Sequence, residues 1–292
     1  MFLSRNLIGK SSSCPLRLFS TISQTPLVTS LAGNAYTDPM YYEIERKNLL
    51  GNNWQLIAHE SQLPQDELIP ASYLAETICN YPTILVRSGK TGEIKGYHNI
   101  CRHRAGPLEW DGTKGSCSIH GLKCKYHGWT YSVDGELKGV PAFNKSCSEP
   151  LNKADYNLWP MRVAVWRGLV FVQQLPPNSS TSSDGNEKGI PMSGEAANAA
   201  FVNDNQAFCD RLTTVPLEEF QVHRTSTHYL KCNWKVYVEN YLEGYHIPTI
   251  HPLLNSQVDM NDYTVHVRDK FIEHTTTTRE SNYEVWCFFF LS

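Results

Sequence analysis

Short apolar runs dominate the first half of the chain, and Gly, Pro and Asn residues separate them. Runs of this length, rich in β-branched and aromatic residues, are typical of half-buried strands. Asp134-Gly135, which lies between Tyr131 and Leu137, is a hairpin signal. The pattern therefore predicts a small antiparallel β domain. The expected strands are Trp54–His59, Ile84–Arg87, Ile94–Asn99, Thr130–Ser132 and Arg162–Val172.

Helical spacing of apolar residues occurs on both sides of this β region. Asp38–Asn53 predicts a short helix that leads into the fold, and Trp234–Tyr245 predicts a second helix. His223–Leu230 and Thr264–Thr277 alternate like strands. The segment 176–191 is poor in apolar residues, so it is expected to be a flexible excursion. A mixed α/β region is expected after it, and the sequence contains no internal repeat.

Composition limits the possible function classes. A chain of 292 residues with 41% hydrophobic content can form one large domain or two medium ones. A formal charge of −3 without a basic stripe argues against a nucleic-acid binder. No run of eighteen apolar residues exists, so we expect no membrane span. Without a long apolar signal peptide, most cysteines are expected to be free thiols in a reducing compartment. These are Cys14, Cys79, Cys117, Cys147, Cys209, Cys232 and Cys287.

The first 35 residues have the composition of a targeting segment. They contain basic residues and many serines, and no acidic residue precedes Asp38. Such a composition is typical of an organelle transit peptide. The run Arg17-Leu18-Phe19-Ser20 resembles a mitochondrial processing site with cleavage after Phe19. We therefore expect a transit peptide at 1–35 and a mitochondrial location, with the plastid as the alternative.

Two short runs each combine a cysteine with a histidine. Cys101 and His103 form the first run, and Cys124 and His127 form the second. In a Rieske iron–sulfur centre two cysteines hold one iron and two histidines hold the other. A structural zinc site instead pairs its cysteines in one knuckle and its histidines in a following helix. Each run here offers one ligand of each kind, which favours a [2Fe-2S] cluster held between two loops. A structural zinc module is the alternative interpretation.

Small and aromatic residues flank these candidate ligands. Gly106 and Gly128 lack a Cβ, which lets backbone amides approach the sulfides of a cluster. Trp129 is expected to pack beside the cluster and shield it from water, although a plain core tryptophan would give the same pattern. Cys117 and His120 lie between the two runs and are interpreted as loop residues, not as ligands.

A second group of candidate ligands follows more than a hundred residues later. His246 and His251 lie five positions apart, and Glu243 precedes the first by three. On a helix Glu243 and His246 would share a face. Pro248 disfavours a continued helix, so His251 can turn back toward the same point. Two imidazoles and a carboxylate with open positions form the facial arrangement of non-haem Fe(II) oxygenases. The sequence thus predicts a mononuclear iron site.

The two motifs together resemble the catalytic (alpha) subunits of Rieske non-haem iron oxygenases. Within that family the chain is most similar to the branch of choline monooxygenase and its ring-hydroxylating or betaine-demethylating relatives. The resemblance runs from Asn53 to the 260s. It implies an α+β fold, in which an antiparallel β Rieske domain precedes a partial, helix-grip-type α/β catalytic domain. The expected bounds are 36–53 for a helical lead-in, 54–175 for the Rieske domain, 176–191 for a linker and 192–292 for the catalytic domain.

The resemblance also implies a reaction and its partners. A small organic substrate, either a quaternary ammonium compound or an aromatic one, would be hydroxylated with dioxygen. A ferredoxin or an NAD(P)H-dependent reductase would supply electrons, which the cluster relays to the mononuclear iron, usually across a subunit boundary in a homotrimer. Glu243 occupies the position of the carboxylate that bridges a cluster histidine and an iron histidine. The aromatic residues near this site are Trp234, Tyr237, Tyr241, Tyr245 and Tyr263.

The sequence departs from related patterns at three points. Respiratory Rieske proteins have a cysteine in each cluster loop where this chain has Gly106 and Tyr126, which favours a low-potential, oxygenase-type cluster. Plant choline monooxygenases carry an additional glycine between the positions of Glu243 and His246. The family's third iron ligand is an Asp far beyond the second histidine, so it is expected beyond Ser292 in a longer chain.

Two consequences follow from that expected truncation. The chain would lack the rest of the catalytic sheet, and a non-catalytic [2Fe-2S] electron carrier or an inactive truncated form becomes the alternative function. The nearest acidic residues that could replace the third ligand are Asp259, Asp262 and Asp269.

Overall fold

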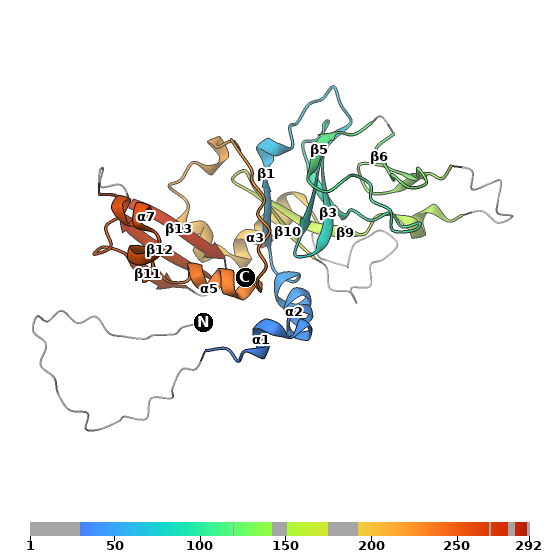
Figure 1. Cartoon of the computed structure of the whole chain (residues 1–292). Coiled ribbons are helices and arrows are strands. Elements are labelled where there is room, and N and C mark those ends of the chain that lie inside the picture. Colours follow the sequence, from blue (N-terminus) through green and yellow to red (C-terminus); the bar gives the residue numbers. More distant parts are fainter. Residues whose placement is uncertain are drawn as a thin grey trace, which may run out of the picture. The chain divides into compact units, whose positions relative to one another are not determined.

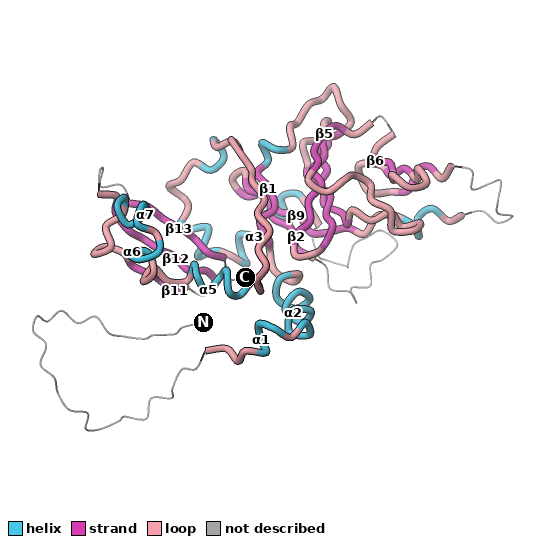
Figure 2. The backbone as a smooth tube through the Cα atoms, viewed as in Figure 1, coloured by secondary structure: helices cyan, strands magenta, loops and turns pink. Residues whose placement is uncertain are grey.

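The structure is a computed structural model. It describes residues 30–118, 120–141, 151–174, 192–268, 270–279 and 284–290, the last of these as backbone only. The chain forms two compact units. The larger unit is Ile44–His228, and the smaller unit joins the part up to Glu43 with Tyr229–Leu291. Figures 1 and 2 show the course of the chain through both.

Antiparallel sheets make up most of the larger unit (Figure 2). Among the described residues, seven strands form one sheet in the order β1-β10-β9-β4-β3-β2-β5, and three short strands form a second in the order β6-β7-β8. The bounds are β1 Gln55–His59, β2 Ala71–Ile78, β3 Tyr81–Ser88, β4 Ile94–His98, β5 Thr113–Ser116, β6 Leu122–Lys123, β7 Thr130–Tyr131, β8 Leu137–Gly139, β9 Pro160–Trp166 and β10 Leu169–Gln173. The antiparallel β domain predicted from the apolar runs is confirmed.

Strand β3 separates two hydrophobic cores. Ile84 and Val86 belong to one core, and Leu85, which points to the other face, belongs to the second. All three side chains are almost completely buried, because β2 and β4 pair with both edges of β3 and both faces are covered. The first core also contains Cys101 and Cys124, so two candidate ligands are part of the domain's hydrophobic interior.

Two hairpin turns shape the strands of this unit. The turn at Gly135, whose φ is +78°, joins β7 to β8 as the sequence predicted. The expected single strand Arg162–Val172 is wrong, because it is a hairpin of β9 and β10. Its turn residues Arg167 and Gly168 both have a positive φ, 49° and 85°. Arginine rarely adopts this conformation, so a two-residue turn at Arg167-Gly168 was not expected.

Short helices precede, interrupt and follow the strands of the larger unit along the sequence. The expected helical lead-in is confirmed as α2 followed by a π-helical turn, η1. Helix α3 packs against β9, and its buried Phe201 stacks on Phe171 with ring centroids 4.2 Å apart. The bounds are α1 Asn34–Thr37, α2 Pro39–Glu45, η1 Arg46–Leu50, η2 Glu60–Gln62, η4 Lys153–Tyr156, α3 Gly194–Asp204, α4 Gln206–Arg211 and η5 Leu217–Glu219.

The C-terminal part of the smaller unit combines short helices with a three-stranded antiparallel sheet (Figure 1). The strand order is β11-β12-β13, and β12 lies in the middle. The expected strand Thr264–Thr277 is two strands, which pair with each other. The bounds are α5 Trp234–Tyr241, α6 Ile247–Ile250, α7 Pro252–Gln257, β11 Thr264–Val267, β12 Phe271–Thr277 and β13 Glu284–Phe290. The mixed α+β class is confirmed.

Two expected elements differ from the structure. His223–Leu230 is not a strand: it has no regular structure, and its side chains are exposed. Alternation alone does not make a strand, because the backbone needs a neighbouring strand for its hydrogen bonds. The helix expected at Trp234–Tyr245 ends at Tyr241, before the glycine at 244.

Several expectations fall outside the described residues. These are the cleavage site in the targeting segment, the linker at 176–191, and the thiols of Cys14, Cys147 and Cys287. The expected free thiols that are described, Cys79, Cys117, Cys209 and Cys232, are free cysteines. Among the described residues, no helix has the length and apolar character needed to cross a lipid bilayer.

Candidate functional site

The loop that follows β4 carries Cys101 and His103. The Cys101 N–H donates to the Gly106 carbonyl (2.8 Å), and the Ala105 N–H donates to the Cys101 carbonyl (3.0 Å). Ala105 has a φ of +56°, which turns the backbone back on itself. The buried amide of Asn99 closes the base of the loop, because its oxygen accepts the N–H groups of residues 108 and 109.

The loop between β6 and β7 repeats this hydrogen-bond pattern. The Cys124 N–H donates to the Trp129 carbonyl (2.8 Å), and the Gly128 N–H donates to the Cys124 carbonyl (3.1 Å). Gly128 stands where the first loop has Ala105, and its φ is +72°. Each loop therefore holds its cysteine at the same place in a backbone turn of the same kind.

The two loops lie in direct contact. A Cβ added at Gly106 would lie 2.8 Å from the Tyr126 Cβ and 3.2 Å from the Cys124 sulfur. The Lys125 N–H also donates to the Pro107 carbonyl across the gap (2.9 Å). Glycine at 106 is thus a steric requirement for bringing the loops together.

The two candidate thiol ligands lie inside the domain. Cys101 and Cys124 are both buried, and their thiols lie within hydrogen-bonding reach of each other. Burial raises the pKa of the Cys101 thiol, so metal binding must displace its proton. The Tyr126 N–H approaches the Cys124 sulfur (3.5 Å), and the Tyr131 hydroxyl lies 3.2 Å from the Cys101 sulfur.

The two candidate imidazole ligands lie at the surface. The rings of His103 and His127 are exposed, with centroids 4.8 Å apart. Burial, followed by the charges of His127 and Arg104, lowers the pKa of His103, which favours the neutral imidazole that binds metals. The indole of Trp129 is buried in the core and stacks on His103, which is compatible with both expected roles, a residue beside the cluster and a core tryptophan.

This donor set fits a two-iron cluster. A buried pair of sulfurs and an exposed pair of imidazoles are brought together from two loops, as two ligand pairs for two irons require. Among the described residues there is no group of three or more His, Cys, Asp or Glu side chains that could hold one metal ion.

The second candidate centre begins where α5 ends. The Glu243 carboxylate accepts hydrogen bonds from Nδ1 of His246 and from the backbone N–H groups of His246 (3.3 Å) and Tyr245. The expected pairing of Glu243 with His246 is present, but its expected cause is not, because the helix has already ended and a turn joins them. Since Nδ1 faces the carboxylate, Nε2 of His246 is free for a metal ion.

Two prolines turn the chain so that His251 approaches His246. Pro248 lies in the first turn of α6, and Pro252 begins α7, so His246 and His251 are the residues that flank α6. Their ring centroids are 5.1 Å apart, with an interplanar angle of 72°. Pro248 was expected to disfavour a continued helix, but it lies in the first turn of α6, where proline is tolerated.

A cavity of about 360 Å³ opens beside these two histidines. Apolar and aromatic side chains from α5, α6 and α7 line one side, and His274 and Thr276 of β12 line another. His274 is buried, and its Nδ1 lies 2.5 Å from the Tyr263 hydroxyl, whereas its Nε2 has no hydrogen-bond partner among the described residues. Burial lowers the pKa of His274, while Glu243 acts in the opposite direction.

No third ligand joins His246 and His251 among the described residues. The Asp259 carboxylate accepts hydrogen bonds from Asn261, and the Asp262 carboxylate accepts one from Thr277. Neither acid lines the cavity. Asp269 lies outside the described residues.

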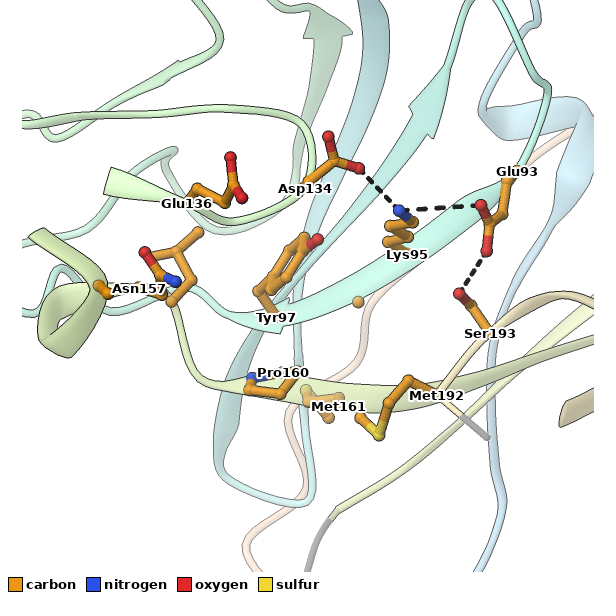
Figure 3. A pocket seen from close by; sticks show the side chains of 13 residues that line it. Glu93, Lys95, Tyr97, Asp134, Glu136, Asn157, Pro160, Met161, Met192 and Ser193 are labelled. Carbon is orange, nitrogen blue, oxygen red and sulfur yellow. Dashed lines mark hydrogen bonds and ion pairs between the residues drawn. The ribbon is translucent and has the colours of Figure 1, made fainter. Parts of the chain in front are cut away.

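A further cavity, of about 600 Å³, lies in the larger unit beside β4 (Figure 3). Lys95 reaches between Asp134 (2.7 Å) and Glu93 (3.8 Å), and Glu93 also accepts a hydrogen bond from Ser193. These contacts tie the β7–β8 turn to β4. None of the candidate metal ligands lines this cavity.

Sequence reasoning missed the contacts of Tyr131 and His274. Tyr131 lies two positions after Trp129, and residues at this spacing share one face of a strand, so both could have been placed at the cluster. His274 gave no comparable signal, because an isolated histidine in an apolar run is compatible with many environments.

Comparisons with known proteins agree with both sites. Residues 53–167 match the family described as Rieske [2Fe-2S] domain, and residues 217–286 match ring hydroxylating alpha subunit (catalytic domain). The chloroplastic choline monooxygenase of Beta vulgaris is 28% identical over 81% of this chain and 48% of its own length. The carnitine monooxygenase oxygenase subunit of Acinetobacter pittii is 28% identical over 78% of this chain and 54% of its own length.

A solved structure of a quaternary ammonium Rieske monooxygenase, described as giving insights into inter-subunit electron transfer, has a TM-score of 0.68. It is 20% identical, and the match covers 87% of this chain and 64% of that one. This likeness shows a shared fold. The chain spans about half the length of the curated relatives it matches.

The expected mitochondrial location is wrong. The choline monooxygenases that this chain resembles are chloroplastic, which points to the plastid. Transit peptides of mitochondria and of chloroplasts are both basic, rich in serine and poor in acidic residues. The composition of the first 35 residues therefore did not distinguish the two locations.

The two matched domains lie in the order that the two motifs predicted. The first implies a [2Fe-2S] cluster, and the second implies a mononuclear iron. The chain therefore belongs to the Rieske non-haem iron oxygenase alpha subunits, the family that includes choline and carnitine monooxygenases.

Proposed function

We propose that this chain provides the catalytic chemistry of an oxygenase that hydroxylates a small organic substrate with dioxygen. The observation that carries the proposal is the cavity beside His246 and His251, in a chain that also brings two thiols and two imidazoles together. An electron carrier needs only the two thiols and two imidazoles that would hold a cluster, and it needs no substrate cavity. The cavity therefore favours the oxygenase over the carrier.

Cys101 and Cys124 would hold one iron of the cluster, and His103 and His127 would hold the other. When bound, the cluster supplies electrons one at a time. The chain's own residues determine its surroundings. The hydrophobic core around the cysteines excludes water from the sulfur side, and the exposed imidazoles leave the other side open to a partner.

His246 and His251 would hold the mononuclear iron together with a third protein ligand. When bound, ferrous iron supplies the site at which dioxygen is activated. Glu243 keeps the proton of His246 on Nδ1 and fixes the direction of the ring, so that Nε2 would be available to the metal. The two backbone N–H groups that donate to Glu243 hold this carboxylate in place.

The substrate class is a quaternary ammonium compound. The name of the similar carnitine enzyme and the description of the similar structure both support this choice. In the cavity, the rings of Tyr237 and Tyr241 lie 5.0 Å apart, and aromatic faces attract quaternary ammonium groups. Of the aromatic residues considered from the sequence, Tyr263 also lines the cavity, whereas Tyr245 is 94% exposed and Trp234 does not line it.

An electron donor and further copies of the chain complete the assembly. The donor is a ferredoxin or an NAD(P)H-dependent reductase, and the oligomer is a homotrimer. The exposure of His103 and His127 supports both partners, because electrons must enter and leave through a surface that another protein can reach.

A single-turnover experiment tests the proposed function. The iron-loaded protein is reduced with dithionite, freed of excess reductant and exposed to dioxygen with choline or carnitine. Mass spectrometry should detect a product that contains one atom of labelled oxygen, and His246→Ala should abolish it while the cluster remains. Cluster oxidation without any oxygenated product, in wild type as in His246→Ala, would contradict the proposal.

A further inference from the structure

Two buried side-chain atoms among the described residues have no hydrogen-bond partner, Nε2 of Gln174 and Nε2 of His274. Gln174 lies at a cavity of about 10 Å³, which has room for about one water molecule. His274 lines the cavity of about 360 Å³ beside His246 and His251, a volume in the range of small-molecule sites. A buried polar atom without a partner destabilises a protein, so its presence at a cavity of this size points to a ligand that satisfies it.

The neighbours of His274 fix its ring and the position of its proton. Nδ1 lies 2.5 Å from the Tyr263 hydroxyl, and the Tyr263 ring in turn packs on Gly244. Burial lowers the pKa of His274, while Glu243 acts in the opposite direction, so the ring is neutral and has a single proton. A phenol is the better donor and an imidazole nitrogen the better acceptor, so Tyr263 donates to Nδ1. The ring proton is therefore on Nε2, the nitrogen for which the described residues offer no partner.

The helices and the sheet give the cavity different chemistry. Tyr237 and Tyr241 of α5 line it with aromatic rings, which attract a quaternary ammonium group. Two polar side chains of β12, His274 and Thr276, also line it. The Thr276 hydroxyl already donates to the Asp259 carbonyl (2.8 Å), so His274 offers the available donor on this strand. A ligand whose cationic group lies at the two tyrosines has the rest of the cavity for a second group, and a buried N–H there favours a hydrogen-bond acceptor.

From this arrangement we propose that His274 is a specificity-determining residue whose Nε2–H donates a hydrogen bond to an oxygen atom of the substrate. The inference rests on the proposed function and names a second group that the substrate must carry. The site takes a quaternary ammonium compound with an oxygen acceptor, which is a hydroxyl in choline and a carboxylate in γ-butyrobetaine. A compound without that oxygen leaves the N–H buried and unpaired, and a site built to hydrogen-bond a substrate group rejects analogues that lack the group.

Binding of two matched pairs of compounds tests this role. Choline is compared with propyltrimethylammonium, in which a methyl group replaces the hydroxyl. γ-Butyrobetaine is compared with butyltrimethylammonium, in which a methyl group replaces the carboxylate. Affinities are measured by anaerobic calorimetry on the iron-loaded full chain. We expect the wild type to bind the oxygen-bearing member of at least one pair about tenfold more tightly than its apolar partner. The pair that shows this preference identifies the oxygen as a hydroxyl or a carboxylate.

Two variants at position 274 have the same chemistry but differ in reach. The amide of His274→Asn lies near the position of Nδ1 and keeps a partner for Tyr263, whereas the amide of His274→Gln extends to the position of Nε2. We expect the preference to disappear in His274→Asn and to persist in His274→Gln. The control is His266→Asn, because His266 is an exposed histidine of the neighbouring strand β11 that does not line the cavity. This control should keep the preference of the wild type.

Three results would overturn the role of His274. These are a wild type that shows no preference within either pair, a folded His274→Asn protein that keeps the preference, and a folded His274→Gln protein that loses it. The last of these also decides the matter where His274→Asn does not fold. The single-turnover experiment separates this failure from that of the proposed function. A labelled product without a preference within either pair contradicts the role of His274 alone, whereas no product and no binding of any of the compounds contradicts both.

Discussion

The imidazole of His103 lies flat against the indole of Trp129. Their ring centroids are 4.6 Å apart, and their planes differ by 7°. Tyr156 packs edge-on against the same indole, at a centroid distance of 5.5 Å. A buried ring thus fixes the orientation of an exposed candidate ligand, although that ligand has solvent on its other side.

Loss of this stacking should loosen the cluster. In Trp129→Ala the ring of His103 can rotate, and a large buried side chain is removed at a cost of roughly 3–5 kcal/mol of unfolding free energy. We expect faster loss of the visible absorption in the presence of an iron chelator. Trp110→Ala is the control, because Trp110 is 61% exposed. Equal rates of cluster loss in Trp129→Ala and the wild type would contradict the role of the stack.

The contact between the loops should be sensitive to one added methyl group. In Gly106→Ala the new Cβ meets Tyr126 and the Cys124 sulfur, so the loops must separate. We expect a destabilisation of roughly 1–3 kcal/mol and less sulfide per chain after reconstitution. The control is Gly33→Ala, where nothing lies within 4 Å of the new Cβ. A full complement of sulfide in Gly106→Ala would show that the loops tolerate a wider separation.

The carboxylate of Glu243 should determine metal affinity at the second centre. Glu243→Gln keeps the shape but removes the negative charge beside Nδ1 of His246. Loss of a group that hydrogen-bonds a metal-binding histidine costs about 10–100-fold in metal affinity. Titration with Co(II), which is followed by its absorption, measures the change. Glu239→Gln is the control: this acid of α5 bonds the Tyr36 hydroxyl and does not line the cavity. Unchanged Co(II) affinity in Glu243→Gln would exclude the orienting role.

Tyr263 should stabilise the turn that carries Glu243. Its ring packs on Gly244, where an added Cβ would lie 2.3 Å from a ring carbon, and its hydroxyl bonds Nδ1 of His274. Tyr263→Phe leaves a buried polar nitrogen without this partner, at a cost of roughly 1–3 kcal/mol. Urea unfolding measures the loss. Tyr229→Phe, at a residue that is 93% exposed, should cost nothing. A stable Tyr263→Phe protein would mean that water satisfies His274.

The structure brings the candidate ligand pairs close to each other, whereas several elements that hold them differ from those predicted from the sequence. Ligand types and their spacing are local properties, so the pairs around Cys101 and Cys124 were identifiable without a fold. Strand β2 was missed because Ala71–Ile78 mixes small and acidic residues with few β-branched ones, and its burial depends on pairing with β3.

The mononuclear site illustrates a second limit. Glu243 and His246 were expected to lie together on one face of a helix, but the helix ends at Tyr241. Hydrogen bonds from backbone N–H groups to the Glu243 carboxylate hold the two side chains together instead. The contacts of Tyr263 with Gly244 and His274 depend on tertiary packing between separate segments of the chain. Such contacts have no period or spacing from which they could be predicted.

The most direct test of the two-centre account is the metal content of the purified, anaerobically reconstituted chain. Iron and acid-labile sulfide are measured together with the electron paramagnetic resonance spectrum of the reduced protein. The account predicts about three irons and two sulfides per chain with a Rieske-type signal, and the loss of one iron in a His246→Ala, His251→Ala double variant. A colourless protein that binds zinc and contains no sulfide would contradict it.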